Sequence, residues 1–431
     1  MPHHGRVAEY IFKNTLIMTE LISGKKANTS PSLLLASQFI FNTGFYAVVP
    51  FLAIFLRDDM LLSGAAIGLV LGLRTFSQQG MFLVGGALTD RFGGRAIILC
   101  GCVVRISGYL LLATSASLWG VILGACLTGT GGALFSPAIE SLMAQAGTQS
   151  EREGKRSRSE WFALFSVCGE LGSVIGPLLG ALLTGYSFQS VALGGAGVFL
   201  FALIMLYFMQ PIGTSHHGTL KISPWWTAFR QRRFVAFIVA YSAYLFSYNQ
   251  LYLALPVELR RSGGSEADLG PLFMLASVMI IFLQLPLARF ARKRGASQIL
   301  PVGFLLLALS FFSVALFAST PPPDTLWRLL PAFSLVTLLT LGQMLIVPVG
   351  MDMIPVFARD KNLGAHYGAL SSMGGVTVLV GNFALGGLLD RALIPSSQAF
   401  VPWLLMGCIP LWSAVAMLFI LRSFKTTSGN Q

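Results

Sequence analysis

The chain has 431 residues, of which 55% are hydrophobic and only 11% are charged. Soluble domains carry roughly 25% charged residues, so this composition excludes a protein whose main solvent is water. The formal net charge of +12 is compatible with nucleic-acid binding, but the basic residues follow an alternation along the chain that membrane topology explains.

Apolar residues gather in stretches of about 20, roughly the length that a helix needs to cross a ~30 Å hydrocarbon core. Glycine and proline inside these stretches do not mark loops, because neighbouring helices can satisfy the backbone groups that they disturb. The sequence therefore predicts an all-α membrane protein with twelve transmembrane helices. The predicted spans cover residues 32–56, 64–88, 96–115, 117–143, 160–184, 190–210, 234–258, 268–290, 298–318, 327–356, 364–389 and 400–421.

The segments between spans suggest a division into two halves. Residues 1–31 lack a long apolar core and a small-residue cleavage site, so a cytoplasmic N-terminal segment is expected there and not a cleaved signal peptide. The long connection at 211–233 separates a six-helix bundle at 32–210 from a second at 234–421, which a cytoplasmic tail at 422–431 follows. The runs GSVIGPLLGALL in the fifth span and GNFALGGLLDR in the eleventh place small residues about one turn apart in each half, as expected for a duplicated unit.

The basic residues predict the orientation. When the connections are assigned alternately to two sides, most of the 29 lysines and arginines share a side with the N-terminus. The other side carries only Arg57, Arg260, Arg261, Arg328 and Arg391. By the positive-inside rule both termini are cytoplasmic, and a multi-pass protein of a bacterial inner membrane is expected. Lipid is then the surrounding partner, and no nucleic-acid partner is expected.

The connection between the second and third spans, GALTDRFGGR at residues 86–95, is the most specific motif. Gly93 and Gly94 permit a tight reversal, while Asp90 at a helix end can meet Arg91 or Arg95. The run resembles the G-x-x-x-D-R-x-G-R-K signature of the major facilitator superfamily: Gly86, Asp90, Arg91 and Gly93 match, Arg95 takes the final basic position, and Gly94 departs from the pattern. The resemblance implies a cytoplasmic gate whose charges break contact when that face opens. The alternative is a plain solvated turn.

A second motif lies in the fifth span, at Gly172, Gly176, Pro177 and Gly180. It resembles the G-x-x-x-G-P-x-x-G motif of drug:proton antiporters in the same superfamily, with Ala181 in place of the usual final glycine. Such a stripe allows close helix packing, and the proline bends the helix. Over roughly residues 64–185 the chain is similar to the MdtH-like multidrug-resistance group, whereas the second half matches in layout alone. The resemblance implies two six-helix bundles, a monomer and transport by alternating access.

Ionisable residues inside hydrocarbon are expensive and are functional candidates by default. Arg74, Arg105 and Glu170 each lie about ten residues inside a span, or roughly 15 Å deep. Glu170 is the first candidate for proton coupling, and the alternative is a fixed salt bridge with Arg105 or Arg74. Glu140 and Asp352, one to two turns from the cytoplasmic ends of their spans, are further candidates for the proton or substrate path. The alternative for each is a cytoplasmic gate or a helix-end charge.

Uncharged polar residues recur at helical spacing and form stripes on two spans. The resemblance implies that the first, fourth, seventh and tenth spans line the substrate cavity, although such a stripe can also serve helix packing. The candidates for the cavity wall, besides the two arginines, are Gln38, Asn42, Tyr46, Tyr241, Tyr244, Tyr248, Asn249 and Gln343.

The sequence lacks the common motifs for binding ATP or a catalytic metal. It has no G-x-x-x-x-G-K-[ST] loop for ATP and no H-E-x-x-H motif, and its five cysteines lack metal-ligand spacing, so no cofactor, no metal and no enzymatic activity are expected. The expected function is proton-coupled efflux of small amphipathic or drug-like molecules. The alternative is transport of an anionic metabolite such as a siderophore, peptide or organic acid, bound by Arg74 and Arg105. A polytopic membrane enzyme or a sensor is a third class, and no cluster of nucleophile, base and metal ligand at one depth supports it.

Overall fold

The computed structural model describes residues 30–156, 158–209, 229–323, 325–358 and 363–428. Most of the predicted N-terminal segment, most of the predicted linker and the last residues of the predicted tail lie outside the described residues. No strand occurs in the part of the chain that the structure describes. The expected all-α fold is therefore confirmed.

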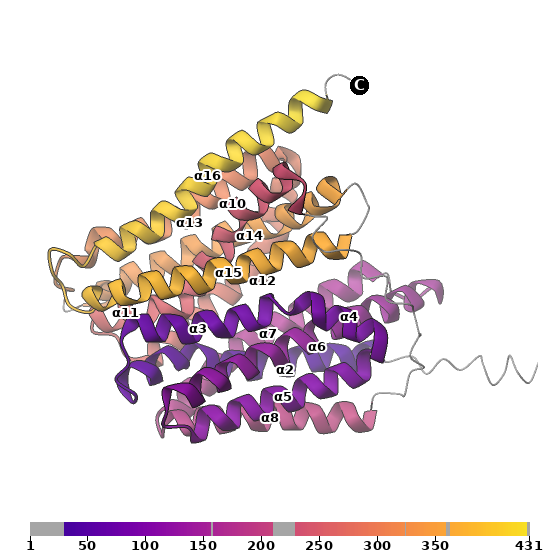
Figure 1. The fold of residues 1–431 in the computed structure, drawn as a ribbon, viewed down its shortest axis with the longest axis horizontal. Coiled ribbons are helices and arrows are strands. Elements are labelled where there is room, and N and C mark those ends of the chain that lie inside the picture. The colour runs from indigo at the N-terminus through magenta and orange to yellow at the C-terminus, as the bar shows by residue number, and fades with distance from the viewer. Residues whose placement is uncertain (1–29, 157, 210–228, 324, 359–362, 429–431) are drawn as a thin grey trace, which may run out of the picture.

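The helices form two bundles that lie side by side (Figure 1). The first contains α2 (Pro31–Asp58), α3 (Gly64–Gln79), α4 (Phe82–Phe92), α5 (Gly94–Thr114), α6 (Leu118–Arg152), α7 (Arg158–Thr184) and α8 (Phe188–Met209). The second contains α10 (Arg232–Leu253), α11 (Leu255–Arg261), α12 (Leu269–Arg294), α13 (Ala296–Ala318), α14 (Leu330–Ala358), α15 (Leu363–Leu389) and α16 (Val401–Ser428). Among the described residues, 11 helices are long and apolar enough to cross a membrane. We call the face where α2 begins and α16 ends the termini face, and the other the opposite face.

Two of the predicted spans are interrupted. The span expected at 64–88 is divided into α3 and α4 at Gly80 and Met81, because glycine is a weak helix former and Met81 takes φ −96° and ψ 1°. The span expected at 234–258 ends as α10 at Leu253 and continues as α11, where Pro256 lacks the N–H that an unbroken helix needs. In both places the break lies in a span that faces the centre of the molecule.

Large apolar side chains cover the outside of the bundles. Phe201, Phe282 and Leu316 are 60%, 71% and 78% exposed, and a soluble protein rarely leaves a contiguous apolar surface of this kind in water. Lipid chains are the solvent that fits this surface. The chain is accordingly a multi-pass membrane protein.

The two halves repeat one turn geometry. Gly93, between α4 and α5, has φ 85° and ψ 147°, and Gly295, between α12 and α13, has φ 79° and ψ 160°. Residues with side chains rarely adopt this left-handed region, so glycine is needed in both places. The second and third spans of each half are thus joined by the same tight reversal, as a duplicated unit requires.

The halves touch along two pairs of helices, α3 with α15 and α7 with α12. On α3, Gly64 and Gly68 lie so close to Gly386 and Asn382 of α15 that a side chain at either glycine would overlap the backbone of α15. Small residues therefore let the two bundles approach at these seams. The central helices α2 and α10 also meet, and the cavity described next lies beside their contact.

Candidate functional site

A cavity of about 230 Å³ lies between the halves in the middle of the molecule. Its wall comes from α2, α3, α5 and α6 of the first half and from α10 of the second. Of the residues predicted for the substrate path, the wall contains Gln38, Asn42, Tyr46, Arg74, Arg105, Glu140, Tyr248 and Asn249. Aromatic rings alternate with amides and charges around this wall, which suits a molecule with both an apolar body and polar groups.

The two arginines are buried in the cavity wall, and none of the described carboxylates pairs with them. Arg74 is 4% exposed and Arg105 is 2% exposed. Arg74 donates from Nη2 to the Thr75 hydroxyl at 3.2 Å and from Nη1 to Gln78 at 3.4 Å. The Nε atoms of both arginines and Nη2 of Arg105 have no hydrogen-bond partner, and no ion pair joins either arginine to a described residue. The site therefore holds two guanidinium groups with unused donors.

Aromatic rings surround Arg105 in place of an acid. Its guanidinium carbon lies 5.0–5.9 Å from the centres of four rings, those of Phe45, Tyr109, Phe135 and Phe199. The guanidinium carbon of Arg74 also lies 5.3 Å from the centre of the Phe45 ring. Ring faces attract cations, so they stabilise the arginines and leave their N–H groups available.

Hydrogen bonds tie the halves together beside the cavity. The hydroxyls of Tyr46 on α2 and Tyr248 on α10 are 2.8 Å apart, and Tyr252 donates to Tyr248 at 3.2 Å. The Thr75 hydroxyl of α3 donates to Oδ1 of Asn249 on α10 at 2.8 Å. The polar stripes of α2 and α10 therefore meet one another and line the cavity at the same time.

Glu170 lies at the α7–α12 contact between the halves and not in the cavity wall. Ser173 donates to its Oε2 at 3.1 Å, and the hydroxyls of Ser173 and Ser277 of α12 are 2.5 Å apart. The carboxylate is half-buried and close enough to Tyr46 and Tyr248 to interact with them electrostatically. The salt bridge considered with Arg105 or Arg74 is absent from the described residues, where Glu170 bonds to Ser173 instead.

Glu140 and Asp352 occupy different places. The Glu140 side chain on α6 is exposed into the cavity and has no hydrogen bond or ion pair with a residue that the structure describes. Asp352 on α14 is exposed too, but it lies near Tyr367 of α15 and outside the cavity wall. Of the three acids singled out from the sequence, Glu140 is the one that faces the cavity.

Three predicted cavity residues lie elsewhere. Tyr241 is 4% exposed and packs on Phe237 with ring centres 5.6 Å apart. Tyr244 stacks on Tyr248 with ring centres 6.3 Å apart and does not line the cavity. Gln343 of α14 does not line the cavity either. The spacing of the tyrosines along the seventh span predicted one face of a helix. The bend of each helix and the packing of its neighbours decide which part of such a face borders a cavity.

The GALTDRFGGR motif forms the end of α4, the Gly93 turn and the start of α5 at the termini face. Arg95 donates from Nη2 to the carbonyl oxygen of Tyr207 on α8 at 2.7 Å, and Arg91 stacks on Phe92. Gly86 lies within α4, and the Asp90 side chain lies outside what the structure describes. The motif therefore ties α5 to α8, and its role as a gate stays a prediction.

The glycine stripe of α7 faces α2. A Cβ placed on Gly176 would lie 2.7 Å from both the Thr43 carbonyl oxygen and the Tyr46 Cβ, and Gly172 and Gly180 are as tightly packed on α2. Pro177 stands inside α7 next to this stripe. The stripe holds α7 against the cavity helix that carries Tyr46.

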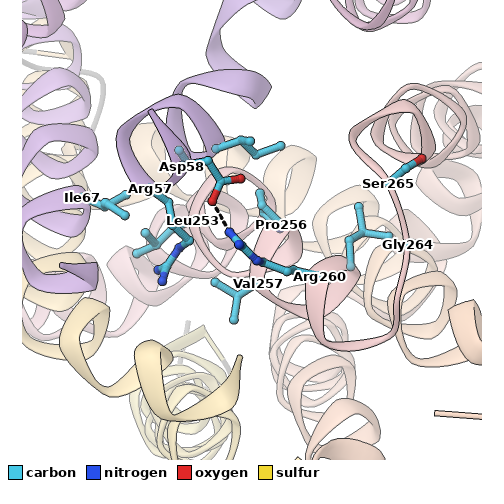
Figure 2. Close-up of a pocket in the computed structure, with 12 residues that line it drawn as sticks. Arg57, Asp58, Ile67, Leu253, Pro256, Val257, Arg260, Gly264 and Ser265 are labelled. Carbon is cyan, nitrogen blue, oxygen red and sulfur yellow. Dashed lines mark hydrogen bonds and ion pairs between the residues drawn. The ribbon is translucent and has the colours of Figure 1, made fainter. Parts of the chain in front are cut away.

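Ion pairs close the opposite face between the halves. Arg57 of α2 donates to Asp390 at 2.8 Å, and Oδ2 of Asp390 accepts from the Gly64 backbone N–H at the start of α3, also at 2.8 Å. Asp58 of α2 pairs with Arg260 of α11 across a second pocket of about 230 Å³ (Figure 2). Figure 2 shows Arg260 reaching from one half toward Asp58 on the other.

Sequence reasoning missed these closing residues and the aromatic cage. Arg57 and Arg260 were counted as orientation signals alone, while Asp58, Asp390 and Phe45 were not singled out. The available signal was that Asp58 and Asp390 directly follow predicted spans on the side where arginines are few, so charge pairing across the halves was the natural inference.

Comparison with known proteins agrees with the fold. The family model described as Major Facilitator Superfamily matches residues 34–382. The "Uncharacterized MFS-type transporter Rv0849" of Mycobacterium tuberculosis is 33% identical over 411 residues, 94% of this chain and 95% of the relative. "Multidrug resistance protein MdtH" of Photorhabdus laumondii is 29% identical over 387 residues, covering 87% of this chain and 90% of the relative.

Solved structures share the same architecture. A POT family transporter in complex with a thioalcohol-conjugated peptide has a TM-score of 0.76 at 14% identity, over 91% of this chain and 96% of that one. The nucleoside transporter NupG also has a TM-score of 0.76, at 12% identity, over 90% of this chain and 99% of that one. At these identities the likeness concerns the fold alone. The match of the family model over most of the chain, together with this fold, places the protein in the major facilitator superfamily of transporters.

Proposed function

We propose that the protein exports small amphipathic or drug-like molecules as a proton-coupled antiporter that works by alternating access. The central cavity between the halves carries the proposal, because its wall combines aromatic rings with amides and buried charges. The MdtH relatives, whose printed name is multidrug resistance protein, support the class of cargo. Binding between two bundles that rock about a central site is the general mechanism of such duplicated folds.

The contacts between the halves support alternating access. They include the Tyr46–Tyr248 bond in the middle and the Arg57–Asp390 and Asp58–Arg260 pairs at the opposite face. These bonds must break before a molecule in the cavity can leave through the opposite face. The basic connections at the termini face support a cytoplasmic position for that face, and with this orientation departure through the opposite face is export across a bacterial inner membrane. One chain supplies the whole cavity wall, which supports a monomer.

Glu170 is the proposed proton carrier. It lies where α7 and α12 of different halves meet, and its hydrogen bond to Ser173 continues to Ser277 on the other half. Adding a proton removes a charge from this contact and changes its hydrogen bonds, which couples protonation to the relative position of the halves. Glu140 and Asp352 are further candidates for the proton path.

Transport into everted membrane vesicles tests coupling. A fluorescent amphipathic dye should accumulate when a proton gradient is applied, and an ionophore that collapses the gradient should stop the uptake. Glu170→Gln should lower gradient-driven uptake strongly, whereas Glu153→Gln, an acid on an exposed loop, should not. Unchanged uptake in Glu170→Gln removes Glu170 from the coupling role, and uptake that survives the ionophore refutes proton coupling itself.

Transport of an anionic metabolite, such as a siderophore, peptide or organic acid, is the second candidate function. The unused donors of Arg74 and Arg105 favour it, because two buried cations that pair with no acid among the described residues attract an anion. A carboxylated ligand whose binding disappears in Arg105→Gln, in protein that still unfolds at the wild-type temperature, would support this candidate. Equal binding by both proteins would contradict it.

A further inference from the structure

We propose that the cargo of the central cavity is zwitterionic, with its acidic group bound by Arg74 and Arg105 and its basic group bound by Glu140. The inference rests on the proposed transport function and names the substrate class of the same cavity. It differs from an anionic cargo because it assigns a second charge of opposite sign to a separate part of the wall.

The acidic group has a site prepared for it. Two guanidinium groups that are 4% and 2% exposed lie in the cavity wall, and three of their nitrogen donors have no partner. They are also close enough to repel one another electrostatically. A buried cation without a counter-ion is costly, and a carboxylate between two such cations removes both penalties at once. Both guanidinium groups contact the Phe45 ring, which lines the cavity beside them.

The basic group has a separate site. Glu140 lines the same cavity, is exposed into it and has no hydrogen bond or ion pair with a described residue. An acid at this depth without a cation is unfavourable for the same reason as an unpaired arginine. An ammonium group on the cargo supplies the missing partner through a charge-assisted hydrogen bond.

The spacing along α6 keeps the two sites apart. The Phe135 ring of α6 lies 5.1 Å from the Arg105 guanidinium carbon, and Glu140 follows five residues later. Five residues of α-helix advance about 7.5 Å, so Glu140 lies well toward the termini face from the arginines. Phe41, Phe135 and Ile139 line the cavity as well. The arrangement fits a molecule with an acid at one end, an amine at the other and an apolar ring between them.

Binding of three matched compounds to the purified full-length protein tests this arrangement. The zwitterion is 4-(aminomethyl)benzoate, the singly charged anion is 4-methylbenzoate, and the singly charged cation is 4-methylbenzylamine. Isothermal titration calorimetry without any proton gradient gives each Kd. The wild type should bind the zwitterion at least tenfold more tightly than either singly charged compound.

Two variants assign the ends. Glu140→Gln should reduce binding of the zwitterion to the level of the anion, and Arg105→Gln should reduce it to the level of the cation. The control variants Glu153→Gln and Arg391→Gln change exposed residues outside the cavity and should keep the wild-type preference. Thermal unfolding of each variant establishes that it is folded.

Three results would overturn the inference: a wild type that binds the anion as tightly as the zwitterion, a wild type that binds none of the three compounds, or a Glu140→Gln variant that keeps the full preference. Because the titration requires no gradient, its outcome is independent of the vesicle assay for proton-coupled export. Selective binding without ionophore-sensitive uptake would refute the coupling and leave the cargo assignment standing. Ionophore-sensitive dye uptake without selective binding would do the reverse.

Discussion

Replacing Asp390 by asparagine removes the negative charge that holds Arg57 and leaves a side chain of nearly the same shape. The Arg57 and Asp390 side chains are 14% and 35% exposed, so the pair lies between a surface ion pair and a buried one. Surface pairs contribute about 0.2–1 kcal/mol, and hydrogen bonds to charged groups about 1.5–3 kcal/mol. The asparagine oxygen can still accept from the Gly64 N–H. The expected loss is therefore about 1–2 kcal/mol of the stability of the closed opposite face.

This loss acts on the balance between two conformations. In the proposed alternating-access cycle the pair joins the two halves in the closed state and is broken in the open one, so about 1–2 kcal/mol shifts the ratio of closed to open molecules by about 5-fold to 30-fold. The fold itself is little affected, because each half keeps its own packed helices. The substitution should therefore populate the form that is open at the opposite face.

Spin labels measure this shift. Leu61, on the loop between α2 and α3, and Ile394, after α15, are 83% and 73% exposed on the opposite face of different halves. After the native cysteines are replaced, labels at these two positions report the distance between the halves by pulsed electron paramagnetic resonance. Asp390→Asn should enlarge the long-distance population, and Glu153→Gln, which breaks an exposed pair within one loop, should leave it unchanged. Identical distance distributions in Asp390→Asn and the wild type would refute the role of this pair in closure.

Further substitutions test the packing that supports the site. Gly176→Ala places a Cβ 2.7 Å from α2 and should destabilise the protein by about 1–3 kcal/mol. Gly197→Ala inside α8 points into open space and should be neutral or slightly stabilising in the same thermal unfolding assay, because alanine favours a helix more than glycine does. Arg261→Met leaves the fully buried Glu258 without its partner and should cost about 3–5 kcal/mol. Adding Glu258→Leu to Arg261→Met should restore much of that loss, and a double variant as unstable as the single one would contradict the ion-pair explanation.

The sequence by itself determined where the chain crosses a membrane and which family it resembles. Stretches of apolar residues are forced into helices because lipid offers no hydrogen bonds to the backbone, so the spans follow from local composition. The tight turn at Gly93 was also predictable, since its positive φ needs a glycine. The break inside the second span was not predicted. Residues 64–88 were expected to form one helix, but Gly80 and Met81 divide them into α3 and α4.

Only the tertiary structure decided which residues face one another. Asp58 and Arg260 are separated by more than 200 positions, yet they pair across the opposite face because the two bundles pack side by side. Depth along a helix could be estimated from residue counts, so Glu170 and Glu140 were both recognised as intramembrane acids. The direction of each side chain depends on how neighbouring helices rotate and bend. That packing places Glu140 in the cavity wall and Glu170 at the seam between the halves.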